Sequence, residues 1–318
     1  MRHAQFASKM SNRFRADKTG VLLLAHGTPE SVDDVPEFLR YVTGGRPLPP
    51  QSIEEIKHRY SLIGRSPLND ITTQQAKALE CEVGLRVYVG MRNWKPFIPD
   101  VVKGMAADGI ARTIAVCMAP QNSRTSVGLY RRAVVGDNGP PFELEFIESW
   151  HDHPLLVEAF ADKLRAGYKL ACRELQAKPP VIFTAHSVPQ QTIAGGDPYD
   201  KQACETAVLV AASAGIAAEN WSFAFQSQGV SGGQWIGPRV EDTILRLKEK
   251  GQRGVFIQSI GFLCDHVEVL YDIDIVFKDF AMKHGMRLWR SESLNDSPTL
   301  IAALADLVRS RLEHGTET

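Results

Sequence analysis

The feature of this sequence that most limits its fold is a repeated alternation of short apolar segments with longer amphipathic ones. Four apolar segments of strand length lie in the first half, at residues 21–25, 87–90, 113–118 and 142–147. The second half repeats the pattern, at residues 181–184, 221–226, 255–257 and 288–290. Strands that alternate with helices favour parallel sheets with right-handed crossovers. We therefore predict an α/β fold with two facing Rossmann-like domains, each a doubly wound parallel sheet.

The domain plan follows from the length and from one repeated sequence. A chain of 318 residues suits two domains of this kind. We expect a disordered tail over residues 1–18, a first domain over 19–150 and a second over 151–318 that ends in a helix. Each domain opens with an apolar strand that runs into Ala-His, which places His26 and His186 at related strand ends. Because open α/β sheets bind ligands at the carboxyl ends of their strands, we predict a cleft between the domains.

Composition excludes several classes of protein. The net charge is −1, which does not favour a nucleic-acid partner. No apolar run is long enough to span a bilayer, and the basic first 18 residues lack the apolar core of a secretory signal. The five cysteines form no CxxC pair, which argues against a zinc site, an iron–sulfur cluster or a disulfide framework. We expect a cytoplasmic protein, and most simply a monomer.

The segment after the strand at 255–257 carries a row of acids. Asp265, Glu268 and Asp272 are spaced by three and four residues, so on a helix they would share one face, with His266 nearby. Hard oxygen ligands beside an imidazole suit a divalent cation or a proton relay. A solvated helix face is the alternative. No glycine-rich phosphate loop follows any expected strand, which disfavours a nucleotide-binding or sugar-binding protein of this fold.

An ordered set of short segments resembles the ferrochelatases, which insert ferrous iron into a porphyrin. The second half carries Thr184–Ala185–His186–Ser187–Val188–Pro189, Gly196–Asp197–Pro198–Tyr199, Gln226–Ser227, Trp235–Ile236–Gly237–Pro238 and Asp265–His266–Val267–Glu268–Val269–Leu270–Tyr271. The first half adds Ser66–Pro67–Leu68, and Gly90–Met91 followed by Pro96–Phe97. The resemblance covers the chain from about residue 19 to its end. It implies two Rossmann-like domains with a porphyrin between them.

The resemblance also implies roles for three residues. His186 corresponds to the family's base, which accepts pyrrole protons or holds the metal, and Glu268 to its carboxylate partner. Asp272, one turn further, corresponds to part of an acidic path for the metal. Insertion exchanges two pyrrole protons for Fe²⁺, so a base that titrates near neutrality and weakly held oxygen ligands make chemical sense. For His186 a structural hydrogen-bonding role is the alternative, and for Asp272 an ordinary surface position.

Porphyrin propionates need donors, and the resemblance implies several. Arg59, Ser66 and Tyr130 fall where coproporphyrin-type members bind propionates, with Tyr60 beside Arg59. Arg46, in a loop rich in Gly and Pro, is a further candidate. Guanidinium groups pair with carboxylates through two parallel hydrogen bonds. Arg59 could instead only cap its helix.

The sequence departs from its family at a few positions. His26 stands where coproporphyrin-using members commonly carry a Tyr that contacts the haem iron, so it is an axial-ligand candidate or a hydrogen-bonded loop residue. Val276 stands where relatives often carry a further acid, and the loop at 63–66 is one residue shorter.

We expect coproporphyrin III as the porphyrin, with protoporphyrin IX as the alternative. No permanently bound cofactor is expected, because Fe²⁺ and porphyrin are substrates, and transient contacts with haem-pathway proteins are possible partners. A cobalt chelatase of the corrin pathway shares the plan but fits the segment from Asp265 to Tyr271 less well. A non-catalytic haem carrier or sensor is the alternative of another class.

Overall fold

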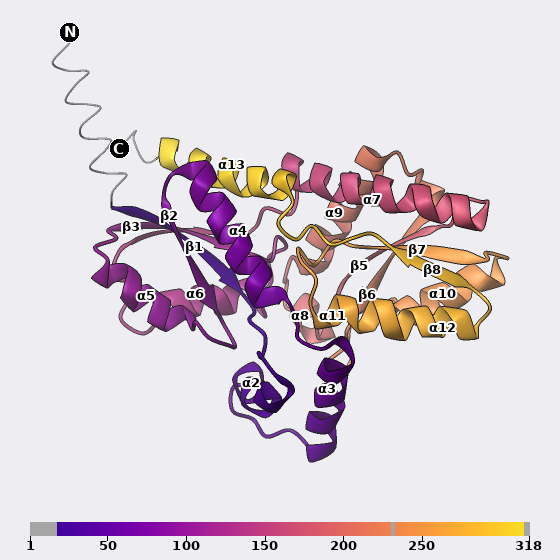
Figure 1. Ribbon diagram of the computed structural model, residues 1–318, viewed down its shortest axis with the longest axis horizontal. Helices are drawn as coiled ribbons and strands as arrows, with labels where there is room; N and C mark the ends of the chain where they lie inside the picture. Colours follow the sequence, from indigo (N-terminus) through magenta and orange to yellow (C-terminus); the bar gives the residue numbers. More distant parts are fainter. Residues whose placement is uncertain (1–17, 230–232, 315–318) are drawn as a thin grey trace, which may run out of the picture.

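The computed structural model of the chain describes residues 18–229 and 233–314 and contains two parallel sheets of four strands each (Figure 1). The predicted tail at 1–18 lies outside the described residues except for Lys18. The first sheet has the order β2-β1-β3-β4 and the second β6-β5-β7-β8. The strands are β1 (Thr19–Ala25), β2 (Arg86–Met91), β3 (Arg112–Cys117), β4 (Glu143–Ile147), β5 (Val181–His186), β6 (Trp221–Gln226), β7 (Gly254–Ser259) and β8 (Arg287–Arg290). The predicted α/β fold is confirmed.

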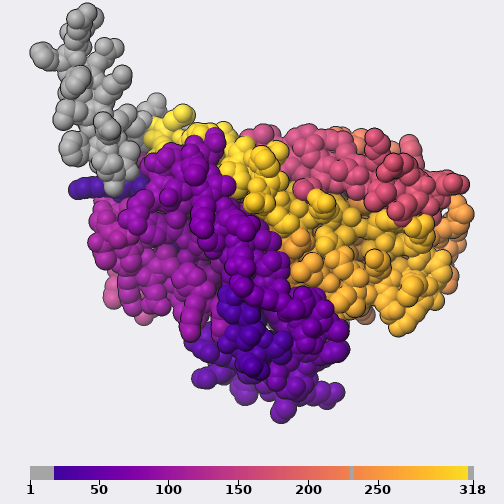
Figure 2. Space-filling view, in the orientation of Figure 1, coloured from indigo at the N-terminus to yellow at the C-terminus, as the bar shows by residue number. Residues whose placement is uncertain are grey.

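Helices cover both sheets. Those of the first half are a short 3-10 turn (Val32–Asp34), α2 (Val35–Val42), α3 (Pro50–Ile63), α4 (Leu68–Val83), α5 (Ile98–Ala107) and α6 (Val127–Val135). Those of the second half are α7 (Pro154–Leu175), α8 (Gln190–Ala194), α9 (Tyr199–Ala214), a 3-10 turn (Ala218–Asn220), α10 (Val240–Glu249), α11 (Val267–Leu270), a π-helix (Asp272–Phe277), α12 (Lys278–Lys283) and α13 (Pro298–His314). Helices α2 and α3 project from the first sheet towards the second half (Figures 1 and 2).

The two central strands explain where the predicted histidines lie. Strand β1 is buried along its whole length and hydrogen-bonds to β2 and β3, and β5 is likewise flanked by β6 and β7. An internal strand with helices on both faces must be apolar throughout, which is why both read as unbroken apolar runs. Each run ends at a histidine, because there the chain leaves the apolar layer: His26 follows β1, and His186 is the last residue of β5. Both imidazoles therefore lie at carboxyl edges.

The C-terminal helix joins the two halves. Helix α13 packs along α4 of the first half and α7 of the second (Figure 1). Leu79, Phe160 and Leu304 share one buried core, and the Gln75 side chain donates to the carbonyl oxygen of Asn295 at 2.6 Å. The domain boundary predicted at residue 150 stays a prediction. This shared core fixes the two sheets relative to each other.

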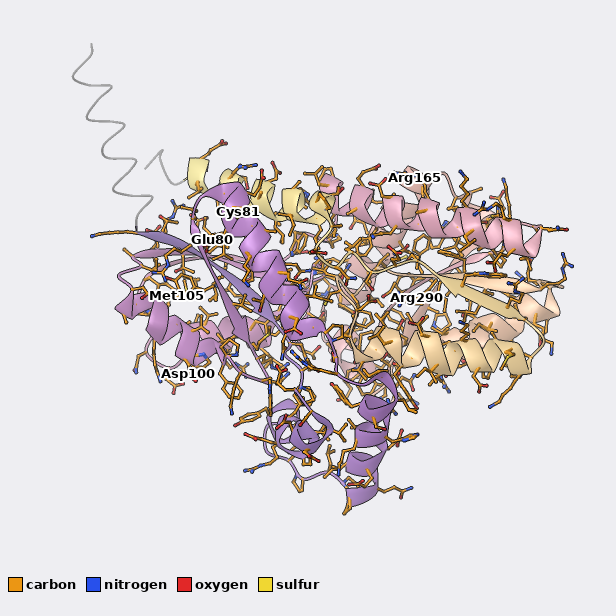
Figure 3. All side chains as sticks on the ribbon, viewed as in Figure 1. Glu80, Cys81, Asp100, Met105, Arg165 and Arg290 are labelled. Carbon is orange, nitrogen blue, oxygen red and sulfur yellow. The ribbon has the colours of Figure 1, made fainter. Side chains whose placement is uncertain are left out.

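The acidic segment differs from its prediction. Asp265 lies before α11, and the residue that precedes that helix, His266, has an extended backbone with φ −163°. The Asp265 carboxylate accepts hydrogen bonds from Ser293 at 2.8 Å and Asn295 at 3.0 Å, and it lies 3.4 Å from Arg290 of β8 (Figure 3). The prediction that Asp265, Glu268 and Asp272 share one helix face is therefore wrong. The reason is that hydrogen bonds from Ser293 and Asn295 and the ion pair with Arg290 hold Asp265 outside the helix.

No helix within residues 18–229 and 233–314 combines the length and the apolar character needed to cross a bilayer.

Candidate active site

A carboxylate shared by two imidazoles forms the centre of the site. The Oε1 atom of Glu268 lies 3.1 Å from Nε2 of His186, and its Oε2 atom lies 3.2 Å from Nε2 of His266. His186 comes from the end of β5, whereas Glu268 lies on α11 after β7. Because β5 and β7 are paired neighbours, their carboxyl ends bring the two side chains together. The structure thus unites the two residues predicted as base and acid.

Several contacts hold these groups in place. The Tyr199 hydroxyl donates to the His186 carbonyl oxygen at 2.9 Å, and the Gln226 side chain donates to the Glu268 carbonyl oxygen at 2.8 Å. The Phe262 ring contacts both imidazoles edge-on, with centroid separations of 6.5 Å to His186 and 4.5 Å to His266. The two hydrogen bonds hold the backbone of His186 and Glu268, and the Phe262 ring packs against both imidazoles, which favours a preorganised site.

Protonation of the His186–Glu268 pair follows from its surroundings. Burial disfavours the charged form of His186, but the charge and hydrogen bond of Glu268 outweigh burial and raise the His186 pKa to about 9. Burial opposes ionisation of Glu268 as well, yet His186 and His266 hold its pKa well below the usual value. At neutral pH the pair is therefore an imidazolium and a carboxylate.

Asp272 supplies a second carboxylate. It begins the π-helix and accepts a hydrogen bond from the Ser227 hydroxyl. Burial is the main reason that its pKa rises to about 6, and the negative charge of Glu268 adds to that rise. Ser227 itself has a left-handed backbone with φ 60°, an uncommon conformation for a residue other than glycine. The charges of Asp272 and Glu268 therefore act on each other, so the two carboxylates lie in the same region of the protein.

No group of three or more His, Cys, Asp or Glu side chains in the described part of the chain is arranged to hold a metal ion. The roles of His186, Glu268 and Asp272 towards a metal stay predictions.

His26 directly follows β1, at the carboxyl edge of the first sheet. Its Nδ1 atom is 3.0 Å from the Gly27 carbonyl oxygen, and its ring contacts Phe38 at a centroid distance of 5.9 Å. Gly27 has φ 80°, and a Cβ there would come within 3.0 Å of Met91, so this turn requires glycine. Although the residue is solvent-exposed, surrounding protein disfavours its charged form and lowers its pKa, against the pull of Glu268. His26 is therefore a neutral imidazole that feels the Glu268 charge.

Arg59 connects the two halves. Its guanidinium forms an ion pair with Glu55 on α3 and lies 5.4 Å from the ring centre of Tyr271. The negative charge of Asp272 also acts on it. The structure therefore places Arg59 beside the acidic segment, but already paired with a carboxylate.

The remaining predicted propionate donors differ in their exposure. Tyr60 and Tyr130 are both 4% exposed, and burial raises the pKa of each phenol; the Tyr60 hydroxyl lies 3.1 Å from that of Thr28. Ser66 is 1% exposed, and its hydroxyl has no hydrogen-bond partner among the described residues. Arg46 is exposed and donates to the carbonyl oxygen of Thr43 at 3.1 Å.

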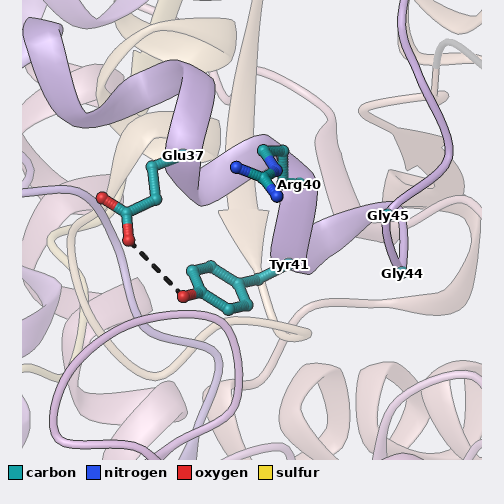
Figure 4. A pocket seen from close by; sticks show the side chains of 5 residues that line it. All are labelled: Glu37, Arg40, Tyr41, Gly44 and Gly45. Atoms are coloured by element: carbon teal, nitrogen blue, oxygen red, sulfur yellow. Dashed lines mark hydrogen bonds between the residues drawn. The ribbon is translucent and has the colours of Figure 1, made fainter.

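A shallow pocket lies close to Arg46 in the sequence. It is lined by Glu37, Arg40, Tyr41, Gly44 and Gly45 (Figure 4). The Tyr41 hydroxyl donates to the Glu37 carboxylate at 3.4 Å across it. None of the predicted site residues is among those that line this pocket.

Three contributors were not predicted as site residues. His266 was noticed beside the acids, but the sequence did not predict its contact with Glu268. Ser227 belongs to a segment that carried the resemblance, but the sequence did not predict its hydrogen bond to Asp272. Arg92, directly after β2, is the third, because its positive charge acts on His26 and helps to lower the His26 pKa. Its place at a strand end was the available signal, because such ends converge in this fold.

Comparison with known proteins agrees with this geometry. The profile of the Ferrochelatase family matches residues 18–312. A protein named ferrochelatase from Acidobacterium capsulatum is 54% identical over 312 residues, covering 93% of this chain and 95% of that protein. A coproporphyrin III ferrochelatase from Geobacillus sp. is 35% identical and covers 93% of this chain and 98% of its own length.

Solved structures share the fold at low sequence identity. SirB from Bacillus subtilis, solved with Fe³⁺, superimposes with a TM-score of 0.59 at 11% identity, covering 94% of this chain and 98% of its own. CbiX, described as the terminal enzyme of sirohaem biosynthesis in denitrifying bacteria, gives a TM-score of 0.50 at 12% identity, covering 92% of this chain and 98% of its own.

Proposed function

The chain belongs to the ferrochelatase family, whose enzymes insert a metal into a porphyrin, and we propose that it inserts Fe²⁺ into coproporphyrin III to give Fe-coproporphyrin. One observation carries the assignment to this chain's own residues. The His186–Glu268 pair, with 3.1 Å between Nε2 and Oε1, lies at the carboxyl ends of the strands of the second sheet. The Glu268 charge also acts on His26, which follows a strand of the first sheet. A base and a carboxylate are the groups that this exchange requires.

The reaction exchanges two pyrrole N–H protons for one Fe²⁺, so the site must bind a cation and release protons. In the free protein His186 already holds a proton because Glu268 stabilises it. Fe²⁺ that binds the Glu268 carboxylate competes with that attraction and lowers the His186 pKa. His186 then releases its proton to solvent and, as a neutral imidazole, accepts a proton from one pyrrole; after it has passed that proton to solvent, it accepts the second pyrrole proton. Asp272, with a pKa of about 6, is mostly ionised at neutral pH and is suited to supply an oxygen ligand on the way in.

The choice of coproporphyrin III over protoporphyrin IX is supported by the names of some relatives. Relatives named coproporphyrin III ferrochelatase, from species of Geobacillus, are 35% and 36% identical to this chain, whereas the relative at 54% identity carries the general name. His26 in place of the Tyr of coproporphyrin-using members is part of the proposal, as an axial ligand to the iron of the product. Arg59, Ser66, Tyr60, Tyr130 and Arg46 are proposed to serve the propionates. We also propose a monomer that works in the cytoplasm without a resident cofactor.

Anaerobic metal insertion, measured with coproporphyrin III and protoporphyrin IX in parallel, tests the function. Conversion of coproporphyrin III at a higher kcat/KM than protoporphyrin IX is the expected result. Preference for protoporphyrin IX would keep the chemistry and reverse the substrate. Tight binding of haem or porphyrin without insertion of any divalent metal would favour a carrier.

A further inference from the structure

Arg92 is a partly buried cation for which the protein provides no counter-ion. Its guanidinium makes one hydrogen bond, a long one of 3.5 Å to the carbonyl oxygen of Thr125. Among the residues that the structure describes, no carboxylate forms an ion pair with it. Arginine carries five N–H donors and stays charged at any physiological pH, so most of its capacity is unused.

The strand order shows where this side chain lies. Arg92 follows β2, and Thr125 lies in the loop after β3; β1 runs between these strands. A side chain that reaches from the end of β2 towards the loop after β3 must cross the end of β1, where His26 lies, because neighbouring strands are about 4.8 Å apart. The backbone N–H groups of Arg92 and Asn93 donate to the carbonyl oxygens of Ala25 and His26, both at 2.9 Å, and fix this crossing. The guanidinium therefore lies over the carboxyl edge of the first sheet.

Other partly buried arginines in the described part of the chain show what is missing here. Arg59 pairs with Glu55, and Arg290 pairs with Asp274 at 2.7 Å. Those carboxylates raise the pKa of both guanidinium groups, whereas burial lowers that of Arg92. A guanidinium that is partly withdrawn from water without a partner carries a desolvation penalty. An anion supplied from outside would remove that penalty.

We propose that Arg92 binds a carboxylate of the porphyrin, an inference that rests on the function proposed above. The opposite charges of the site favour this arrangement. Glu268 and Asp272, on the second sheet's side, suit the metal, whereas Arg92 and the neighbouring Tyr130 phenol, on the first sheet's side, suit an anion. Arg46 and Arg59, the arginines singled out from the sequence, already bond to Thr43 and Glu55. Arg92 is the arginine among these that keeps its donors free.

Porphyrin binding by variants tests this role. Dissociation constants are measured by porphyrin fluorescence for coproporphyrin III and for its tetramethyl ester, which has the same ring without charges, at one detergent concentration. Arg92→Met is expected to weaken binding of the acid at least about tenfold and to leave binding of the ester unchanged. Arg92→Lys, which keeps the charge but not the planar fork, should restore part of the affinity. The matched control is Arg86→Met at the other end of β2, where the side chain is 62% exposed and paired with Asp108; it should change neither constant.

The outcomes separate this inference from the proposed function. Arg92→Met that binds the acid as the wild type does, or that loses acid and ester equally, overturns the role of Arg92. If Arg92→Met does not fold, Arg92→Lys decides: an unchanged constant for the acid overturns the role. If the wild-type protein binds neither coproporphyrin III nor its ester, the proposed function is overturned together with the role of Arg92. If it binds and metallates coproporphyrin III, the proposed function stands whatever the variants do.

Discussion

The guanidinium of Arg59 lies 5.4 Å from the centre of the Tyr271 ring, so a helix of the first half touches the acidic segment of the second. The two residues are more than 200 positions apart, and Arg59 is also within the field of Asp272. Such a cation–π contact is worth about 0.5–2 kcal/mol, depending on its exposure. It links α3 to the segment that carries Glu268 and Asp272.

Replacing Arg59 tests whether this link serves the porphyrin. Arg59→Ala is expected to raise the dissociation constant of coproporphyrin III about tenfold while changing the rate of metal insertion at saturating porphyrin much less. The reason is that the role proposed for Arg59 is to bind a porphyrin propionate and not to take part in the exchange at the pyrrole nitrogens. Fluorescence titration and single-turnover insertion give the two numbers. An unchanged dissociation constant would leave Arg59 with a structural role only.

His186→Ala tests the base. General acid–base catalysis contributes roughly 10²–10⁴-fold, so insertion should slow by at least about 100-fold. Because the side chain is 32% exposed and ends its strand, the fold should survive, which circular dichroism and thermal unfolding check. His153→Ala is a matched control, since His153 pairs with Asp306 away from the site. Substantial turnover by His186→Ala would contradict the assignment of His186 as the base.

The pKa of His186 should depend on Glu268. The Glu268 charge raises that pKa to about 9. Glu268→Gln should lower it, because burial, which disfavours the charged imidazole, is then the dominant influence. The folded pKa lies above the unfolded value near 6.5, so the pair stabilises the fold fully below about pH 6.5 and loses this contribution as pH rises through about 9. NMR titration of the imidazole and urea unfolding from pH 6 to 9.5 measure both. A His186 pKa that is the same in wild type and variant would refute the coupling.

Arg290 should stabilise the acidic segment. Its guanidinium bonds to Asp274 of the π-helix through two hydrogen bonds of 2.7 Å and lies 3.4 Å from Asp265. Arg290→Gln removes the cation that pairs with two partly exposed carboxylates, so the loss should lie between the ~1 kcal/mol of an exposed pair and the ~3 kcal/mol of a fully buried one. We expect a lower unfolding free energy in urea. Arg287→Gln, on the same strand but with a 55% exposed side chain, should cost less than about 1 kcal/mol. Equal losses in the two variants would contradict this role.

His26 should be visible in spectra of the product complex. As an axial ligand, its imidazole would determine the spin state of the bound iron, and its lowered pKa keeps the ring nitrogen available. His26→Ala is expected to change the absorption spectrum of bound Fe-coproporphyrin, and His26→Tyr to give a phenolate-type spectrum. Spectra that are identical in wild type and His26→Ala would exclude ligation.

Much of the chemistry could be predicted because it is local. Strand ends mark where this fold places functional side chains, so His186 and His26 were found from apolar runs that end in histidine. The spacing of the acids drew attention to Glu268, and the family resemblance supplied the predicted roles of His186 and Glu268. By contrast, the sequence also suggested a single helix face for Asp265, Glu268 and Asp272, and this failed because an ion pair with Arg290, 25 positions away, holds Asp265 outside the helix.

The sequence by itself determined the succession of strands and helices along the chain and the α/β class, since both depend on hydrophobic periodicity, and its resemblance to a family pointed to His186 and Glu268, whose roles stay predictions. The tertiary structure alone decided which side chains meet and which charges are satisfied. Only the packing of the two sheets shows that Glu268 contacts His186 at the end of another strand and that Arg92 has no carboxylate partner among the described residues, whereas the Arg59–Glu55 pair lies within one helix. Contacts between separate elements depend on the spatial order of the strands in each sheet and on burial, and residues that are neighbours in the chain determine neither.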